Sequence, residues 1–390
     1  MGWQGRLIRK NMKIFFLGAG FSQPAGLPLG NGLFLKVLEE AKLHGMYNES
    51  LEYHINEYLD YYCAKTGEEI TEDKIKLEEF ISYLDIDRYL MLHGGDYTAP
   101  EERFKNLIAY VLYNHEKRIA DDKLTLYEHF VERLNPDDII FTFNYDTILE
   151  SGLTRKNIPY RFHQFRYRYD ERANRLVLDW KEEIAIYKMH GSINWFDKSD
   201  YQESKRLWDE ASVVGYPIHA AFDNRMEGET HRLLDEPFQP TDPLKNMYIV
   251  KNLGKYFDNY FEQGNSKTNQ YPFIISPSHH KLISLSYLND FWYQFSTMAP
   301  GANRISIIGF SLPAHDEYIR QPMYWYIRNF HEHGKPLNGK KLKLKIIDYK
   351  ISQKEIDEFK ANYRFVDQSM TDFYFGGFCE DALDIIFSKD

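Results

Sequence analysis

Short apolar runs alternate with longer amphipathic stretches along the chain. The apolar runs suit strands that are buried on both faces of a parallel sheet, whereas apolar residues at helical spacing suit the helices that cover such a sheet. The repeated order of strand, helix and strand predicts an α/β protein with a doubly wound parallel sheet of about six strands. The six predicted strands cover residues 13–17, 139–143, 184–189, 272–276, 304–308 and 342–347.

A long helical stretch separates the first two predicted strands. Apolar residues recur at helical spacing from residue 33 to 41, which predicts a helix that packs on the sheet. Further stripes follow over residues 45–134, for example Phe80 with Leu84. About ninety residues is far more than one connection between strands needs. A large helical insertion at 45–134 is therefore predicted within a single domain that spans residues 13–390.

The remaining segments carry weaker patterns. Residues 160–170 and 175–180 flank a turn signal, which predicts an antiparallel hairpin. Arg161, Arg166 and Arg168 on its first strand suit a solvated edge strand better than a phosphate contact. Few runs can be assigned between residues 197 and 270. Further helices are predicted at 253–261, 284–298 and 316–331, and residues 1–12 are predicted to be an N-terminal extension, since Met12 directly precedes the first strand.

Composition and charge exclude several classes of protein. The 390 residues carry 48 Lys and Arg against 58 Asp and Glu, a net charge of −10, so direct nucleic-acid binding along a broad surface is not expected. Cys63 and Cys379 are too few for a disulfide framework or a four-cysteine zinc module. No apolar run is long enough to span a bilayer, and residues 1–10 lack an apolar signal core. A soluble, cytoplasmic protein without membrane contact is therefore predicted.

A glycine-rich turn follows the first predicted strand. Gly18, Gly20 and Ser22 come directly after the strand, and Gly26-Leu-Pro28 follows them. Glycines let the backbone turn closely against a ligand before a helix begins, which is where α/β proteins cradle a phosphate. Gln23 stands where a dinucleotide-binding dehydrogenase has its third glycine. Taken alone, the turn is weak evidence for nucleotide binding, because a glycine-rich turn after a strand is often only a tight turn.

Three further stretches place polar residues at the ends of predicted strands. They are Thr142-Phe-Asn144-Tyr-Asp146, His190-Gly-Ser-Ile-Asn-Trp195 and Gly309-Phe-Ser311-Leu-Pro313. In open α/β sheets, ligands bind beyond the carboxyl ends of the strands. These polar side chains are therefore expected where a nucleotide would lie.

Together, the four stretches resemble the sirtuin family. Sirtuins carry, in this chain order, a Gly-x-Gly-x-Ser opening, a Thr-x-Asn-x-Asp motif, a His-Gly pair and a Gly-x-Ser motif. The chain resembles the sirtuin-like NAD hydrolases of bacterial antiphage defence, which keep the sirtuin NAD pocket and lack the zinc module. Its length resembles that of the partner of a HerA-type hexameric ATPase. The resemblance implies a Rossmann-like sheet, NAD as the substrate and no bound metal.

The resemblance also implies roles for individual residues. Asn144 would position the ribose or the attacking water, and Asp146 would orient the nicotinamide or the ribose. His190 would be the general base, because the unperturbed pKa of histidine, about 6.5, lies near working pH. Simpler interpretations stay open, since a histidine at a strand end is often structural and Asp146 could simply bond to backbone amides. The residues implied to bind NAD are Gly18, Ala19, Gly20, Phe21, Ser22, Gly309, Ser311 and Asp348, of which Asp348 could equally cap its strand.

Alternative functions remain beside the hydrolase. The chain could be an NAD-dependent protein deacylase or ADP-ribosyltransferase, although deacylating sirtuins have Asp-Phe-Arg after their Gly-x-Pro, where this chain has Leu29-Gly-Asn31. It could also be a non-catalytic nucleotide-binding sensor or scaffold, against which the presence of Asn144 and His190 argues. His279-His280 and His331-Glu-His333 are the only tight histidine pairs, and neither completes a metal site.

A homo-oligomer controlled by a second protein is also predicted. Unchecked NAD hydrolysis would deplete a cofactor that the cell itself needs, so the activity must be held back. The apolar stripes of residues 45–134 exceed what covering one face of a sheet requires, and they could meet another subunit.

Overall fold

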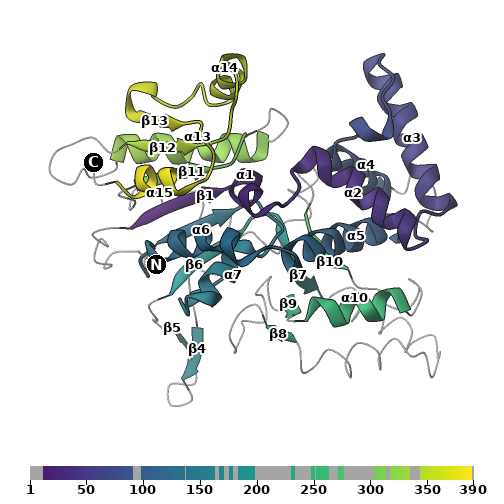
Figure 1. Ribbon diagram of the computed structural model, residues 1–390, viewed down its shortest axis with the longest axis horizontal. Helices are drawn as coiled ribbons and strands as arrows, with labels where there is room; N and C mark the ends of the chain where they lie inside the picture. Colours follow the sequence, from purple (N-terminus) through teal and green to yellow (C-terminus); the bar gives the residue numbers. More distant parts are fainter. Residues whose placement is uncertain are drawn as a thin grey trace.

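Seven strands form the main sheet of the protein, and every pair of neighbours runs parallel (Figure 1). The predicted doubly wound parallel sheet is therefore confirmed, with one strand more than expected. The strand order is β13 (Thr371–Tyr374), β12 (Leu344–Ile347), β11 (Arg304–Ile308), β1 (Lys13–Leu17), β2 (Ile139–Thr142), β6 (Ile184–Lys188) and β3 (Tyr160–Arg161).

The computed structural model describes most of the sheet and helices. The described residues are 12–90, 98–136, 138–162, 167–170, 175–178, 183–197, 230–232, 247–250, 252–262, 271–275, 302, 304–312, 317–333 and 343–388. The predicted helix at 284–298 lies outside these residues, as do Arg166, Pro313, residues 279–280 and all but the last residue of the predicted extension 1–12.

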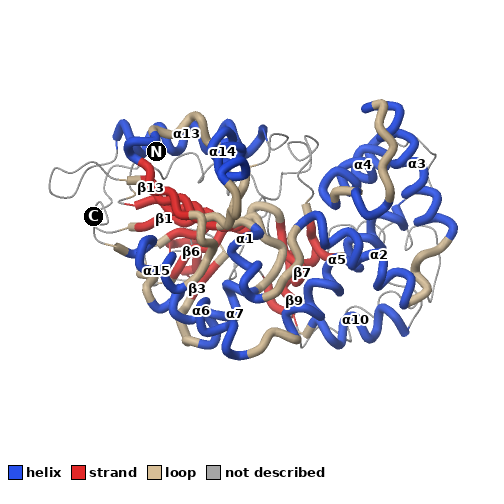
Figure 2. Tube along the Cα trace, turned by 45° about the horizontal axis from the view of Figure 1, so that its top comes forward, coloured by secondary structure: helices blue, strands red, loops and turns tan. Residues whose placement is uncertain are grey.

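Helices cover both faces of the main sheet, because strand β1 buries alternate side chains in opposite directions. Phe15 contacts Phe130 and Phe387 on one face, at ring-centroid distances of 5.4 and 5.8 Å. Phe16 contacts Tyr326 on the other face at 5.4 Å. Figure 2 shows the sheet between α13 and α14 on one side and α6, α7 and α15 on the other. These helices are α6 (Asp121–Glu132), α7 (Ile148–Arg155), α13 (Glu317–His333), α14 (Gln353–Asn362) and α15 (Glu380–Phe387).

Four further helices form a group beside the sheet, which we call the helical arm. They are α2 (Gly30–Leu43), α3 (Glu49–Thr66), α4 (Leu77–Leu90) and α5 (Thr98–Lys117). Phe34 of α2 packs on Phe80 of α4 and Phe104 of α5, with ring centroids 5.3 and 5.7 Å apart. The prediction that this first helix packs on the sheet is therefore wrong. An apolar stripe shows that a helix is half-buried, but it does not show which element covers the stripe.

A second, antiparallel sheet lies next to α5 (Figure 1). Its order is β10 (Pro272–Ile274), β7 (Gly191–Asp197), β9 (Met247–Val250) and β8 (Thr230–Arg232). The helix α10 (Leu253–Glu262) confirms the predicted helix at 253–261, and its Tyr256 hydroxyl donates to Asn106 Oδ1 of α5 at 2.7 Å. Residues 272–276 were predicted for the parallel sheet, which is wrong, because a short apolar run does not specify the direction of pairing.

The predicted hairpin is confirmed only in part. Strands β4 (Tyr167–Asp170) and β5 (Arg175–Leu178) pair antiparallel as expected. Tyr160 and Arg161, assigned to the same hairpin, instead form the edge strand β3 of the main sheet. Within the described part of the chain, no helix combines the length and apolar character needed to cross a bilayer.

Candidate functional site

The main sheet has a topological switch point between β1 and β11. The chain passes from β1 towards β2 and β6 on one side, whereas β12 and β13 lie beyond β11 on the other. Such a switch point opens a crevice at the carboxyl ends of the two strands, which is where doubly wound proteins bind nucleotides. The glycine-rich turn after β1, which is formed by Gly18 and the short helix α1 (Ala19–Ser22), meets the turn after β11, which contains Gly309–Leu312.

Three glycines pack against one another where the two turns meet. The Gly20 amide donates to the Gly309 carbonyl oxygen at 2.9 Å. A Cβ atom on Gly18 would lie 2.5 Å from that oxygen, and one on Gly20 would lie 2.6 Å from the Gly309 Cα. The contact between the two backbones therefore explains why these positions are glycine, whether or not a ligand also approaches them.

We expect Gly309→Ala to destabilise the protein by about 1–3 kcal/mol from backbone strain alone. The close contact of its Cβ should add to this cost. Gly309 has φ +62°, and its Cβ would lie 2.3 Å from Gly20 C and Phe21 N. Denaturant unfolding measures the change. Gly32→Ala is the matched control, because Gly32 lies in a helix with nothing within 4 Å of its Cβ position. Equal stability of the two variants would contradict the close contact between the turns.

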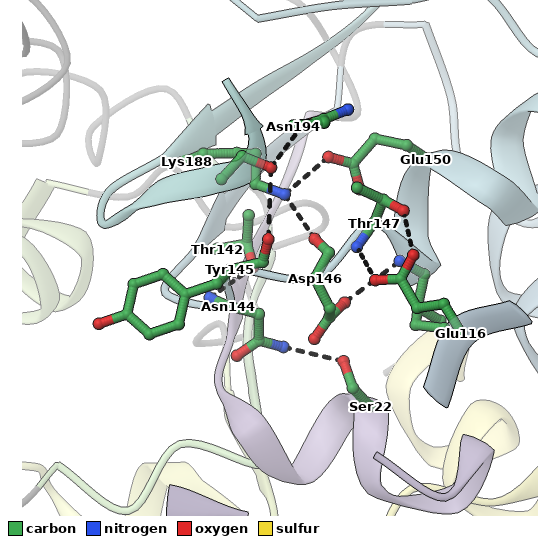
Figure 3. Close-up of polar contacts among 12 residues, drawn as sticks. Ser22, Glu116, Thr142, Asn144, Tyr145, Asp146, Thr147, Glu150, Lys188 and Asn194 are labelled. Atoms are coloured by element: carbon green, nitrogen blue, oxygen red, sulfur yellow. Dashed lines mark hydrogen bonds and ion pairs between the residues drawn. The ribbon is translucent and has the colours of Figure 1, made fainter. Parts of the chain in front are cut away.

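Asn144 connects the end of β2 to the glycine-rich turn. Its Nδ2 donates to the Gly18 carbonyl oxygen at 2.9 Å and to Ser22 Oγ at 3.1 Å. Its backbone amide donates to Thr142 Oγ1 at 3.1 Å. Among the described residues, Asn144 Oδ1 accepts no hydrogen bond, and Figure 3 shows this oxygen turned away from Ser22. The side chain is buried and held by its amino group, which leaves its oxygen available to a ligand.

Asp146 lies at the centre of a buried charged network (Figure 3). Burial raises the pKa of Asp146, against the opposing effects of the Lys188 charge and of a hydrogen bond from Ser22. Lys188, whose side chain is fully buried, donates to the Asp146 carbonyl oxygen at 2.5 Å and to Glu150 Oε1 at 2.8 Å. Asp146 Oδ1 also accepts from the Ile148 amide at 3.2 Å. Asp146 therefore does bond to a backbone amide, as the simpler interpretation expects. This bond does not exclude a second role in orienting the nicotinamide or the ribose.

His190 follows β6, the strand next to β2, and is nearly buried. Its ring meets the Phe143 ring edge-on at 5.2 Å, and Phe143 stacks on Phe310 at 4.3 Å with a 9° interplanar angle. Gly191 has φ +76°, and a Cβ there would lie 1.9 Å from the Phe273 carbonyl oxygen of β10. The glycine of the His-Gly pair is therefore required by the close approach of β10.

Ser311 and Asp348 lie on the other side of the switch point, after β11 and β12. Ser311 is exposed, and its carbonyl oxygen accepts from Asn362 Nδ2 at 3.1 Å. Asp348 Oδ1 accepts from the Tyr349 amide at 2.7 Å and from Lys350 Nζ at 2.9 Å. The predicted residues therefore fall into two groups at the same edge of the sheet: one around Asn144, and one after β11 and β12.

Sequence reasoning missed three residues that support the first group. Lys188 ends an otherwise apolar strand, and a charged residue in that position is a signal that could have been noticed. Tyr127 of α6 donates to the Phe21 carbonyl oxygen at 2.9 Å and accepts from the Ala25 amide at 3.1 Å, so it fixes the glycine-rich turn. Glu116 of α5 bonds to Thr147, and nothing in its sequence surroundings distinguishes it from a solvated helix residue.

The described residues contain no group of three or more His, Cys, Asp or Glu that could hold a metal ion. Cys63 and Cys379 are both free thiols.

Comparison with known proteins identifies a related segment. A family model described as a SIR2-like domain matches residues 138–215, which include β2, Asn144, Asp146, β6 and His190. No curated protein matches the chain. Among solved structures, it is similar to the structure of Sir2Tm bound to a propionylated peptide, with 11% identity over 97% of this chain and 92% of that one and a TM-score of 0.31. The chain therefore contains a SIR2-like segment that includes the candidate catalytic residues.

Proposed function

We propose that this protein is an NAD glycohydrolase that cleaves NAD to nicotinamide and ADP-ribose. One observation carries the proposal: Asn144 bonds to both Gly18 and Ser22 at the switch point of a doubly wound sheet. A polar side chain is thereby held at the edge where such sheets bind nucleotides. The match of residues 138–215 to a SIR2-like domain supports NAD as the nucleotide.

The reaction breaks the bond between the ribose carbon and the nicotinamide nitrogen. The bond electrons leave with the nicotinamide, water attacks the ribose carbon, and one proton is released from that water. Such chemistry depends on positioning and on a base, and it needs no strong nucleophile. We assign Asn144 to hold the ribose or the water through its Oδ1, Asp146 to orient the nicotinamide or the ribose, and His190 to accept the proton.

The same proposal assigns residues to the rest of NAD. The segment Gly18, Ala19, Gly20, Phe21 and Ser22 would line the phosphate site, where its glycines let the backbone approach the ligand closely. The amides of Gly18, Gly20 and Phe21 themselves donate to backbone oxygens. Gly309 and Ser311 would hold the other part of the pyrophosphate or the adenosine. Asp348 would bond to the adenosine ribose hydroxyls, with Lys350 balancing its charge.

Nicotinamide release from NAD by the purified protein tests this function. We expect nicotinamide and free ADP-ribose in equal amounts, with no acceptor protein present. Release that requires an acylated peptide would favour a deacylase, and ADP-ribose attached to protein would favour a transferase. Binding of NAD without turnover under any condition would favour a sensor or scaffold.

We further propose that the activity depletes NAD in antiphage defence, as a homo-oligomer controlled by a HerA-type hexameric ATPase. The helical arm is the surface that we assign to subunit or partner contact. Light scattering on the isolated chain, together with NAD turnover with and without such an ATPase, tests this arrangement. A monomer that hydrolyses NAD at the same rate with and without the ATPase would contradict it.

We expect chelators to leave both nicotinamide release and thermal unfolding unchanged. A metal bound only to the folded state would stabilise it, so its removal would lower the melting temperature. Elemental analysis of the purified protein completes the test. Stoichiometric zinc, or a melting temperature that falls with chelator, would contradict the prediction.

A further inference from the structure

The last turn of α5 contacts the segment that carries the candidate catalytic residues. Glu116 Oε1 accepts from the Thr147 amide at 2.8 Å, and Glu116 Oε2 bonds to Thr147 Oγ1 at 2.5 Å (Figure 3). Thr147 follows Asp146 directly and is the N-cap residue of α7. Its own side chain makes no capping hydrogen bond. The amide and the hydroxyl of Thr147 are therefore directed to α5, whereas its carbonyl oxygen accepts from the Ser151 amide of α7.

The helical arm is attached to the site at both of its ends. Its first helix, α2, begins at Gly30, shortly after the turn that contains Gly18 and Ser22. Its last helix, α5, ends at Lys117, one residue after Glu116. Aromatic contacts join α2, α4 and α5 into one body. The position of the arm is therefore linked to the position of the segment 144–147.

We propose that Glu116 is a positioning residue for NAD cleavage, which holds segment 144–147 in its catalytic geometry and joins it to the helical arm. This inference rests on the proposed function. Glu116 touches neither Asn144 nor a reacting atom in this assignment, and it acts through Thr147 and the adjoining Asp146. Its loss should therefore change the rate of bond cleavage more than the affinity for NAD.

Two charged groups act on Glu116 directly, Asp146 from the segment itself and Lys188 from β6. Lys188 is in turn paired with Glu150 of α7. Burial, followed by the negative charge of Asp146, raises the pKa of Glu116 to about 8. At neutral pH the group is therefore mostly protonated and neutral. Above about pH 8, Glu116 ionises beside Asp146. Repulsion between the two carboxylates should then displace segment 144–147.

The test is steady-state kinetics of nicotinamide release by Glu116→Ala and Glu116→Gln. We expect Glu116→Ala to lower kcat by about 10–100-fold while KM changes by less than about threefold. Glu116→Gln resembles the neutral acid, so it should restore most of this loss at neutral pH. It should also lack the fall in kcat that the unsubstituted protein shows above about pH 8. Glu358→Gln, an exposed change on α14 outside the helical arm, is the control and should leave the kinetics unchanged.

A second pair of variants covers the case in which Glu116→Ala does not fold. Thr147→Val keeps the amide bond to Glu116 and loses the hydroxyl bond, so it should lower kcat in the same direction. Thr147→Ser should restore it. The inference is overturned if the unsubstituted protein is active and its kcat is unaffected by Thr147→Val and, where that variant folds, by Glu116→Ala. Absence of nicotinamide release from the unsubstituted protein would instead overturn the proposed function.

Discussion

Asn144→Ala should lower the rate of nicotinamide release by about 10²–10⁴-fold, the range expected when a polar group that acts in the transition state is removed. The variant loses the Oδ1 that we assign to the ribose or the water. It also removes the donor to Gly18 and Ser22, so a stability loss of about 1–3 kcal/mol is expected. Turnover must therefore be measured where circular dichroism shows a folded protein.

A variant of similar stability cost separates the two effects. Asn48 caps α3 by accepting from the Leu51 amide at 3.1 Å, so Asn48→Ala should cost about 1 kcal/mol. It lies in the helical arm, and we expect its NAD turnover to stay unchanged. His190→Ala should lose activity as Asn144→Ala does. If Asn144→Ala and Asn48→Ala both lose activity in proportion to their loss of folded protein, Asn144 has a structural role.

Much of the main sheet could be predicted because its central strands are buried on both faces. Ile14 to Leu17 and Ile139 to Thr142 are all buried, and a continuous apolar run is the pattern that such strands produce. The edge strand β13 was not predicted, because it is not buried on both faces. Of its residues, only Thr371 is buried, so Thr371–Tyr374 carries no apolar run.

The predicted site residues fall at one edge of the sheet because each follows a strand of the same parallel sheet. Asn144 and Asp146 follow β2, His190 follows β6, and Gly309 follows β11. Parallel strands bring all of their carboxyl ends to one edge, so chain order alone was sufficient for this grouping.

Contacts between sequence-distant side chains could not be predicted in this way. Glu116 meets Thr147 only because the helical arm returns to the site, and hydrophobic periodicity contains no information about that return. The antiparallel strand β10 is a further example, since it explains Gly191 through the Phe273 carbonyl oxygen. Each of these features depends on which element a segment packs against. The sequence pattern indicates only which of its side chains are buried.

Lys188→Met should destabilise the protein by about 3–5 kcal/mol, the usual cost of removing one partner of a buried ion pair. The Lys188 side chain is fully buried, and its loss leaves Glu150, only 6% exposed, without its positive partner. A loss of this size is a large part of the 5–15 kcal/mol, roughly, by which most domains are stable. Denaturant unfolding measures it, and Lys343→Met, at an exposed ion pair with Asp372, should cost about 0–1 kcal/mol.

The double variant Lys188→Met with Glu150→Gln tests the cause of that loss. If the cost arises from the unpaired Glu150 charge, removing the charge should recover most of the stability, because a buried pair contributes little beyond its own desolvation. If the cost arises instead from the lost bond to the Asp146 carbonyl oxygen, the double variant should remain as unstable as the single one.

In the first case nicotinamide release should return together with stability, since the backbone of Asp146 is then still held by Thr147 and Glu116. In the second it should stay low even in the folded protein, because Lys188 would then be what fixes the segment 144–147. A loss below about 1 kcal/mol in the single variant would contradict both explanations.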